Sequence, residues 1–352
     1  MSSSNKNKSK KSYIKSKSDK EKEKISKKNK IKNSINTDKE EEIKIPEYIT
    51  INSISKGRIK DYALLSKQGI TEEGFQNINQ VSCLILPNLY NFKDFNIFFI
   101  LEGHGHESYF ISDFIKQYFS SYFESNPILN PKNNKNLDYV YYLLQRNNYS
   151  LIKEIFQKAE EELKNNKKIN SDFSGTSCIM VIQIGEKIIC ANVGDSRAFM
   201  VKTLDRIIPL SFEHWPNLFE ESERILKNGG EIYKTEEDYY NEGVFRIWKK
   251  GEKYPGIRVS RSIGDNIATK LGVICTPEII EQYIDKDIRL VIIGTKALFE
   301  FLSNKDIMDI IAPFYFKNDP KGACKTIVEI VRELYFNKYL YIDDITVCVI
   351  FF

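Results

Sequence analysis

The chain has 352 residues and is 41% hydrophobic, which is enough to bury a substantial core in one large domain or two ordinary ones. Its formal net charge of +4 is unevenly spread, because residues 1–45 hold 15 lysines against 7 acidic residues. The longest apolar run is too short to span a bilayer, and no secretory leader follows the basic start. These features exclude an integral membrane protein and predict a soluble protein in the cytoplasm.

Residues 1–45 form a basic tail that lacks periodic apolar positions, so we predict that it is disordered when free. The tail either acts only as a solubilising arm or contacts an acidic polymer, such as nucleic acid, an anionic membrane or an acidic protein surface. Aromatic residues do not alternate with its lysines as in many nucleic-acid binders, which disfavours a nucleic-acid partner.

The first half of the chain combines strand and helix patterns. Apolar runs and alternation predict strands at residues 45–55, 62–70, 80–89 and 96–103. Helical spacing follows at 107–123 and 137–166, and asparagines near the middle of the second segment predict a break in it.

The second half begins with two apolar runs joined by the turn signal "IGEK", within residues 175–201. Helices are predicted at 216–230, 298–304 and 324–340, strands at 279–284, 289–295 and 345–352, and a surface flap at 231–256. Long strands and long helices without βαβ alternation predict one α+β layered domain over residues 46–352.

The six cysteines form no CxxC pair and mostly stand among apolar neighbours. We expect reduced core residues, rather than disulfides or a zinc site. They are Cys83, Cys178, Cys190, Cys275, Cys324 and Cys348.

Six blocks of sequence occur in a fixed order: "FFILEGHGH", "SGTSCIMVIQIGEKIICANVGDSRAFMV", "LSFEHWPNLFEESERILKNGGEI", "GIRVSRSIGDNIATKLGVICTPEI", "LVIIGTKALFEFLSNKDI" and "DDITVCVIFF". Together they resemble the metal-dependent type 2C protein serine/threonine phosphatases, the PPM family. The resemblance implies a sandwich of two antiparallel sheets flanked by helices. It also implies a site at one end of the sandwich, where carboxylates hold two Mn²⁺ or Mg²⁺ ions and a bridging water attacks the phosphorus.

Two positions of that implied site have lost their function. Val81 stands where the family has its first metal-binding acid, and an isopropyl group cannot bind a cation. The family's phosphate-holding arginine falls near Gln76, so the guanidinium that would grip a dianion is absent.

The block "EGHGH" keeps part of the site. Glu102 replaces the bridging aspartate and is longer by one C–C bond, roughly 1.5 Å, whereas catalytic arrangements tolerate about 0.5 Å of displacement. Gly103, whose family counterpart binds metal through its carbonyl oxygen, is retained. His104, whose counterpart is a proposed general acid, is retained as well.

Lys296 is the most diagnostic substitution, because it replaces the third metal-binding aspartate. An ammonium about 4 Å from a divalent ion would repel it by roughly 8 kcal/mol at an effective dielectric constant of 20. Asp343 keeps the fourth acidic position. We therefore predict that the Lys296 ammonium occupies the space of one ion and forms an ion-pair cluster with Glu102 and Asp343.

Four further residues have structural interpretations. Asp195 matches a family residue near an accessory metal, but we interpret it mainly as a cap of its turn. Arg197, Arg261 and Asp265 are predicted to be ion-pair and turn residues that hold the ends of the sandwich.

The aromatic residues of the flap allow two interpretations. Trp215, Trp248 and the tyrosines of "TEEDYYNEGVF" could form a protein-binding patch, or they could cover the flap's own small core.

The leading hypothesis is a catalytically degenerate family member, a pseudophosphatase that serves as an interaction module and needs no cofactor. One alternative is an active Mn²⁺- or Mg²⁺-dependent phosphatase with an altered site around Glu102, Asp343 and Asp195. Another is a module that binds phosphopeptides without cleaving them. The expected partner is a protein or a large assembly, for which a cytoskeletal or ciliary structure fits the basic tail; the sequence does not fix the oligomeric state.

Overall fold

The computed structural model describes residues 48–49, 57–76, 78–130, 136–203, 205–234, 243–339 and 341–352. The predictions for the basic tail, for most of the strand at 45–55 and for residues 235–242 of the flap lie outside these residues. Within them, the predicted α+β architecture is confirmed: two antiparallel sheets stack on each other, and helices cover their outer faces.

The first sheet has six strands in the order β1-β2-β16-β15-β8-β9. These strands are β1 (Tyr48–Ile49), β2 (Asp61–Lys67), β8 (Arg197–Lys202), β9 (Arg206–Pro209), β15 (Ile288–Gly294) and β16 (Ile345–Phe351). Strands β2 and β16 pair over their full lengths, so the first and last long strands of the described chain are neighbours. The sheet therefore depends on contacts that are very distant in sequence.

The second sheet has seven strands, ordered β13-β5-β4-β6-β7-β14 with β3 beside β4. These strands are β3 (Val81–Leu86), β4 (Phe95–His104), β5 (Gly175–Thr176), β6 (Cys178–Ile184), β7 (Lys187–Val193), β13 (Ile263–Gly264) and β14 (Glu278–Tyr283). The turn predicted at "IGEK" joins β6 to β7, and Gly185 adopts a φ of 55° there.

Strand β4 is apolar from Ile97 to Leu101 because both of its faces are buried there. Phe99 and Leu101 pack against the helices on the outer face, whereas Phe98 and Ile100 belong to the core between the sheets. Side chains alternate along a strand, so Glu102 continues the face that points between the sheets.

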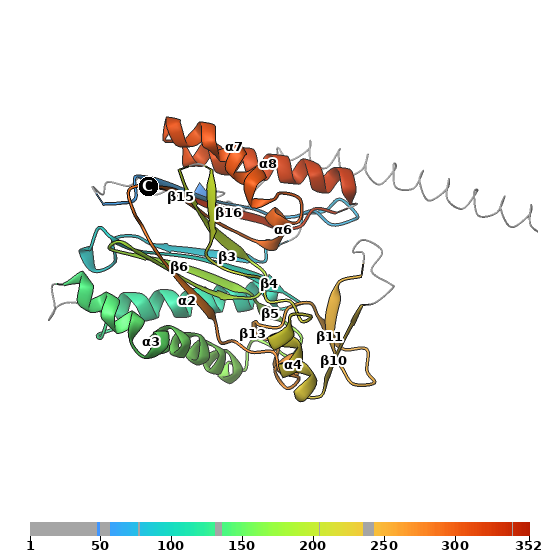
Figure 1. Ribbon diagram of the computed structural model, residues 1–352. Coiled ribbons are helices and arrows are strands. Elements are labelled where there is room, and N and C mark those ends of the chain that lie inside the picture. The colour runs from blue at the N-terminus through green and yellow to red at the C-terminus, as the bar shows by residue number, and fades with distance from the viewer. Residues whose placement is uncertain are drawn as a thin grey trace, which may run out of the picture.

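Helices α2 (Ser108–Ser125) and α3 (Leu137–Asn165) cover the second sheet, while α7 (Asn304–Lys317) and α8 (Pro320–Lys338) cover the first (Figure 1). The break predicted within α3 is confirmed, because residues 146–149 have non-helical backbone angles. The apolar stripe of α8 is buried against β2 and β16.

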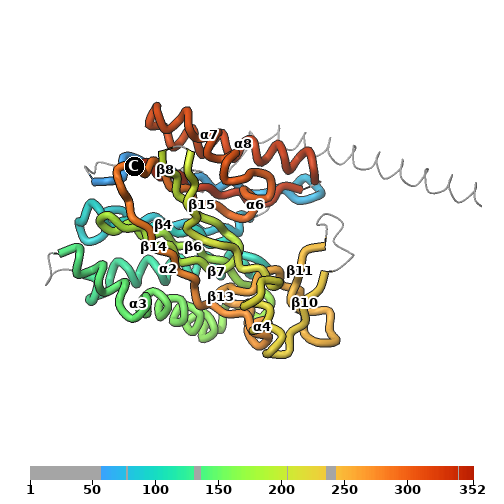
Figure 2. The backbone as a smooth tube through the Cα atoms, in the orientation of Figure 1, coloured from blue at the N-terminus to red at the C-terminus, as the bar shows by residue number. Residues whose placement is uncertain are grey.

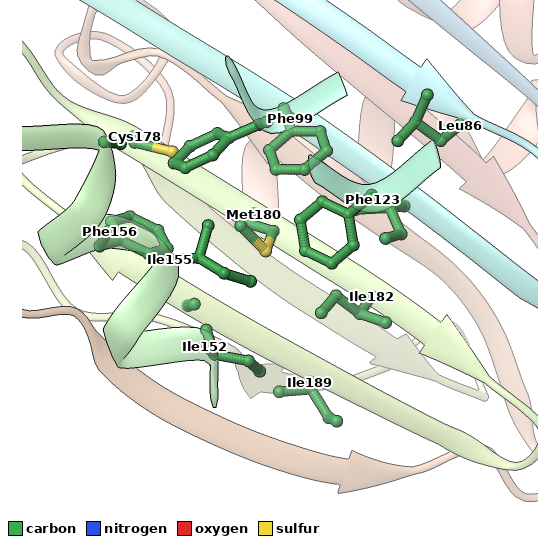
Figure 3. Packing of buried hydrophobic residues seen from close by; sticks show 14 of the residues in the cluster. Leu86, Phe99, Phe123, Ile152, Ile155, Phe156, Cys178, Met180, Ile182 and Ile189 are labelled. Atoms are coloured by element: carbon green, nitrogen blue, oxygen red, sulfur yellow. The ribbon is translucent and has the colours of Figure 1, made fainter. Parts of the chain in front are cut away.

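Aromatic rings fill the layer between the second sheet and its helices. Figure 3 shows Phe99 of β4, Phe123 of α2 and Phe156 of α3 around Met180 of β6. The ring of Phe99 also stacks on Phe119, with centroids 5.4 Å apart. This packing fixes β4, and with it the strand end that carries Glu102.

A smaller antiparallel sheet stands at one end of the sandwich, away from the C-terminal residue (Figure 2). It contains β10 (Gly230–Lys234), β11 (Phe245–Lys249) and β12 (Pro255–Ile257), next to α4 (Phe219–Lys227). The predicted flap therefore contains strands. Trp248 is 9% exposed and stacks on Tyr233 with ring centroids 5.3 Å apart, so it packs within this small sheet.

The helix predicted at 298–304 is wrong. The chain forms the short α6 (Lys296–Phe299), and α7 begins at Asn304. Ser303 has extended backbone angles and caps α7: its Oγ accepts from the backbone N–H of Asp306, whose carboxylate accepts from the backbone N–H of Ser303. This capping box starts α7 at the residue where the predicted helix was expected to end.

Replacing Ser303→Ala should lower the free energy of unfolding by about 1 kcal/mol, because an N–H at the start of α7 loses its acceptor. Urea denaturation measures this change. Ser303→Thr keeps the hydroxyl and serves as the matched control. Equal losses in both variants would contradict a capping role.

Candidate functional site

The candidate site lies at the end of the sandwich where α6 begins (Figure 1). Gly294, the last residue of β15, pairs with both neighbouring strands, opposite Val347 of β16 and Arg197 of β8. The turns beside these three strands therefore share one end of the sheet. They carry Asp195, Lys296 and Asp343.

Val81 and Glu102 lie directly opposite each other in the antiparallel pair of β3 and β4. Opposed side chains lie on the same face with Cβ atoms about 4.5–5.5 Å apart. Val81 is 8% exposed and belongs to the core between the sheets. Val81, which the resemblance places at the family's first acid, is therefore an apolar neighbour of Glu102.

Two donors already bind the same oxygen of Glu102. Its Oε2 accepts from the backbone N–H of Lys296 at 3.1 Å and from the Ser196 hydroxyl at 3.3 Å. Burial raises the pKa of Glu102 to about 8, and the charges of Asp195 and Asp343 add to the increase. The Lys296 backbone N–H and ammonium oppose it but do not cancel it. Glu102 is therefore mostly a neutral carboxylic acid at pH 7.

The predicted ion-pair cluster of Lys296 with Glu102 and Asp343 needs correction. Among the described residues, the Lys296 ammonium forms one ion pair, at 2.8 Å from Oε2 of Glu300. The two residues are four positions apart at the short helix α6, so they meet on one face. The charge of Lys296 still lowers the pKa values of Glu102 and Asp343, but without a direct ion pair.

Glu300 was missed by the sequence reasoning, although its spacing from Lys296 was a usable signal. Its carboxylate also accepts from the hydroxyls of Tyr339 at 2.6 Å and Tyr335 at 3.1 Å. Burial alone would raise the pKa of Glu300, but the Lys296 charge and these bonds hold it below its ordinary value. Lys296 is thus paired with an ionised carboxylate that also accepts two tyrosine hydrogen bonds.

Asp343 and its neighbour Asp344 have different roles. Burial raises the pKa of Asp343, which the positive charges of Lys296 and Arg258 partly offset. Asp344 accepts from the backbone N–H groups of Gly69 at 2.6 Å and Gln80 at 2.7 Å. Asp344 therefore clamps the start of β16 to the loop before β3, which the sequence reasoning did not foresee.

The interpretation of Asp195 as a cap also needs correction. Within the described ranges, its carboxylate makes no hydrogen bond, and its charge instead contributes to the raised pKa of Glu102. Gly194 takes the special conformation of this turn, with a φ of 105°. A glycine therefore sets the turn, and Asp195 remains an acidic neighbour of Glu102.

His104 forms a dyad with Asp265, and their Nε2 and Oδ2 atoms are 2.6 Å apart. The same Oδ2 accepts from the Ser262 hydroxyl at 2.6 Å. Burial would lower the pKa of His104, but the Asp265 charge and hydrogen bond raise it overall. His104 thus keeps a carboxylate partner that suits a proton donor.

Gly103 is required by packing, independently of any metal. A Cβ at this position would lie 2.6 Å from the backbone oxygen of Ser108 and 2.9 Å from that of Gln80. Gln76 accepts a hydrogen bond from Gln68, so its side chain forms a local contact in the loop after β2. Neither observation indicates a retained catalytic role.

The two predicted arginine ion pairs are confirmed. Arg197 donates from Nε to Glu213 at 2.6 Å and from Nη1 to Asn304 at 3.0 Å. Arg261 donates from Nη2 to Glu221 at 2.7 Å, which joins the main sandwich to α4. Both pairs support the fold rather than the chemistry.

The donor set does not match the four carboxylates that bind two divalent ions in the resemblance. One position is apolar Val81 and another is the cation Lys296, while Oε2 of Glu102 already accepts two hydrogen bonds. Divalent Mn²⁺ and Mg²⁺ bind oxygen ligands that include ionised carboxylates, in near-octahedral geometry for Mg²⁺. Within the described ranges, no three His, Cys, Asp or Glu side chains are arranged to hold a metal ion.

Residues 86–333 match the family model described as Protein phosphatase 2C, and the chain belongs to this family. "Probable protein phosphatase 2C 35" of Arabidopsis thaliana is 26% identical over 307 residues, covering 82% of this chain and 83% of that protein. "Probable protein phosphatase 2C 73" of the same plant is 29% identical over 197 residues, covering 54% of this chain and 52% of that protein. Members of this family are Mn²⁺- or Mg²⁺-dependent serine/threonine phosphatases.

Solved structures agree in fold. A serine-threonine phosphatase 2C from Toxoplasma gondii has a TM-score of 0.69 at 18% identity, covering 83% of this chain and 94% of that chain. Stp1 from Staphylococcus aureus has a TM-score of 0.53 at 16% identity, covering 84% of this chain and 96% of that chain. These similarities show the sandwich architecture alone.

The cysteines are reduced, as predicted from the sequence. All six cysteines are free, and Cys83 and Cys275 are the two that are not fully buried. In the part of the chain that the structure describes, no helix is long and apolar enough to cross a membrane.

Proposed function

We propose that this chain is a pseudophosphatase, which keeps the type 2C fold as an interaction module and does not hydrolyse phosphoesters. The observation that carries the proposal is the position of Lys296, whose backbone N–H binds Glu102 at 3.1 Å while its ammonium is fixed on Glu300 at 2.8 Å. A fixed positive charge beside the bridging carboxylate opposes the binding of a divalent ion.

The rest of the site supports the same proposal. Val81 offers no ligand opposite Glu102, and burial together with the charges of Asp195 and Asp343 raises the pKa of Glu102. A proton and a metal ion compete for the same carboxylate oxygens, so the raised pKa of Glu102 also weakens metal binding.

A protein partner is part of the proposal. Helix α4 exposes two large apolar side chains, Phe219 at 74% and Leu226 at 58%. They are seven positions apart, which places them on one face of the helix. This face and the basic tail are the regions through which the chain would attach to a protein assembly.

The direct test is an activity assay of the purified protein with a phosphoserine peptide and Mn²⁺ or Mg²⁺. We expect phosphate release no faster than in the metal-free blank, because the site lacks the ligands that would hold an attacking water. Manganese-dependent release that disappears in Glu102→Ala and Asp343→Ala would establish the alternative, an active enzyme with an altered site. Metal-dependent release that persists in both variants would indicate a contaminating phosphatase.

A further inference from the structure

Three buried polar atoms lack a hydrogen-bond partner within the described residues where β7 and β14 meet the loop after β9. They are Nε2 of His214, Oε2 of Glu278 and Oδ1 of Asn192. His214 is 3% exposed and Asn192 is 1% exposed, whereas the side chain of Glu278 is 39% exposed and it is its Oε2 atom that is buried. An unpaired buried polar atom costs about 1–3 kcal/mol, so three in one region point to a ligand that pairs with them.

The three side chains converge. Asn192 and Glu278 are opposed residues of β7 and β14. Both lie near the backbone of Phe212: its oxygen accepts from Nδ2 of Asn192 at 2.9 Å, and its N–H lowers the pKa of Glu278. His214 is two residues further on, with its Nε2 3.9 Å from Oε2 of Glu278. That distance is too long for a hydrogen bond and suits one bridging atom.

The backbone of Gly194 determines the tautomer of His214. Its N–H and its carbonyl oxygen both lie 3.1 Å from Nδ1 of His214, but the carbonyl oxygen already accepts from the backbone N–H of His214 at 3.0 Å and from Nδ2 of Asn192 at 3.4 Å. The Gly194 N–H, in contrast, has Nδ1 as its acceptor within the described residues, so Nδ1 accepts this hydrogen bond. Burial and the nearby Arg261 charge lower the pKa of His214 to about 3, so the ring is neutral and its proton resides on Nε2.

The unpaired set thus contains one donor, Nε2–H of His214, and two acceptors, on Glu278 and Asn192. A water molecule accepts one hydrogen bond and donates two, which matches this set. We propose that a single internal water binds His214, Glu278 and Asn192 and is a built-in part of the fold.

A metal ion fits the same atoms poorly. The protonated Nε2 has no lone pair to offer, and the positive charge of Arg261 acts on both His214 and Glu278. A divalent cation would lie in a region that already holds a guanidinium.

The water site acts on the candidate site through one turn. His214 holds Gly194, and the next residues of that turn are Asp195 and Ser196, which contribute to the environment of Glu102. The water fixes the His214 ring, and the ring fixes the turn. This role does not depend on whether the chain is an active enzyme.

The chain contains three histidines, so ¹⁵N-histidine labelling of the full protein resolves each ring. The double variant His104→Asn/His106→Asn leaves only the signals of His214. We expect a protonated Nε2 and an unprotonated Nδ1 that do not change between pH 5 and 8, and a cross-relaxation peak between Nε2–H and a long-lived water. A protonated Nδ1, an Nε2–H in fast exchange with bulk water, or no water peak would overturn the proposal.

A matched pair of variants at Glu278 provides a second test. Glu278→Gln keeps an acceptor oxygen and should retain the water peak. Glu278→Met removes the acceptor and should lose the peak, with Tm lower by about 2–4 °C. If the water peak is the same in both variants, the assignment of Glu278 as a water ligand is wrong.

Discussion

The double variant Val81→Asp/Lys296→Asp should bind Mn²⁺ roughly 100-fold or more tightly than the unchanged chain. It restores acids at the two positions where the family resemblance has them, and both lie beside Glu102: Val81 opposite it in the sheet and Lys296 bonded to it through the backbone. The change replaces one positive charge and one apolar group by two negative charges. Removing an ammonium about 4 Å from a divalent ion relieves several kcal/mol of repulsion.

Mn²⁺ binding is measured by the loss of the free-ion electron paramagnetic resonance signal during titration. The matched control is Val81→Asn/Lys296→Asn, which has the same side-chain shapes without the charges and should bind weakly. The aspartate variant should also be less stable than the unchanged chain without metal and should recover Tm when Mn²⁺ is added. Equal affinity of the two double variants would show that charge at these positions does not control metal binding.

Glu102→Gln should stabilise the protein at alkaline pH, on the order of 2–4 kcal/mol at pH 8.5. The pKa of Glu102 is raised to about 8 in the folded chain, chiefly by burial. Below the ordinary pKa near 4.5, the folded and the unfolded chain both hold the proton. The ionisation of Glu102 therefore does not lower the free energy of unfolding in that pH range. As pH rises towards 8, the unfolded chain releases the proton while the folded chain keeps it, so the free energy of unfolding falls. Glutamine cannot ionise and removes this loss.

Urea denaturation of both proteins from pH 5 to 9 measures the difference, which should be small at pH 5 and should grow until about pH 8. Glu300→Gln is the matched control with the opposite sign, because the pKa of Glu300 is lowered in the folded chain. That variant should lose stability above the ordinary pKa, where the carboxylate is ionised. A pH-independent difference between Glu102→Gln and the unchanged chain would contradict the protonated state.

Much of the fold could be predicted because its signals are local. Alternating or continuous apolar runs gave the long strands, and the asparagines of α3 marked its break. The α6–α7 boundary was missed because apolar spacing continues across it, while the stop depends on the hydrogen bonds of Ser303. The flap strands β10 and β11 were missed because residues 231–256 show no clear apolar period, although Ile247 and Trp248 of β11 are buried.

The sequence predicted which residues lie at the candidate site better than it predicted the contacts that they make. Val81, Glu102 and Asp343 lie at the same end of the sandwich, as the resemblance implied. The predicted partners of Lys296 were wrong. Its long side chain can reach several carboxylates, and the path of α6 places Glu300 within ion-pair distance. The hydrogen bonds of Asp344 to Gly69 and Gln80 depend on a contact between the two ends of the domain.

By itself, the sequence determined the family and the loss of two acidic positions, because side-chain identity decides which atoms can bind a cation. Val81 cannot do so in any fold. Only the tertiary structure decided the burial and the partners of the side chains in the candidate site. The raised pKa of Glu102 results from its burial beside Asp195 and Asp343, and the fixed Lys296 results from the position of Glu300. Both depend on distances between segments far apart in the chain, which no local pattern encodes.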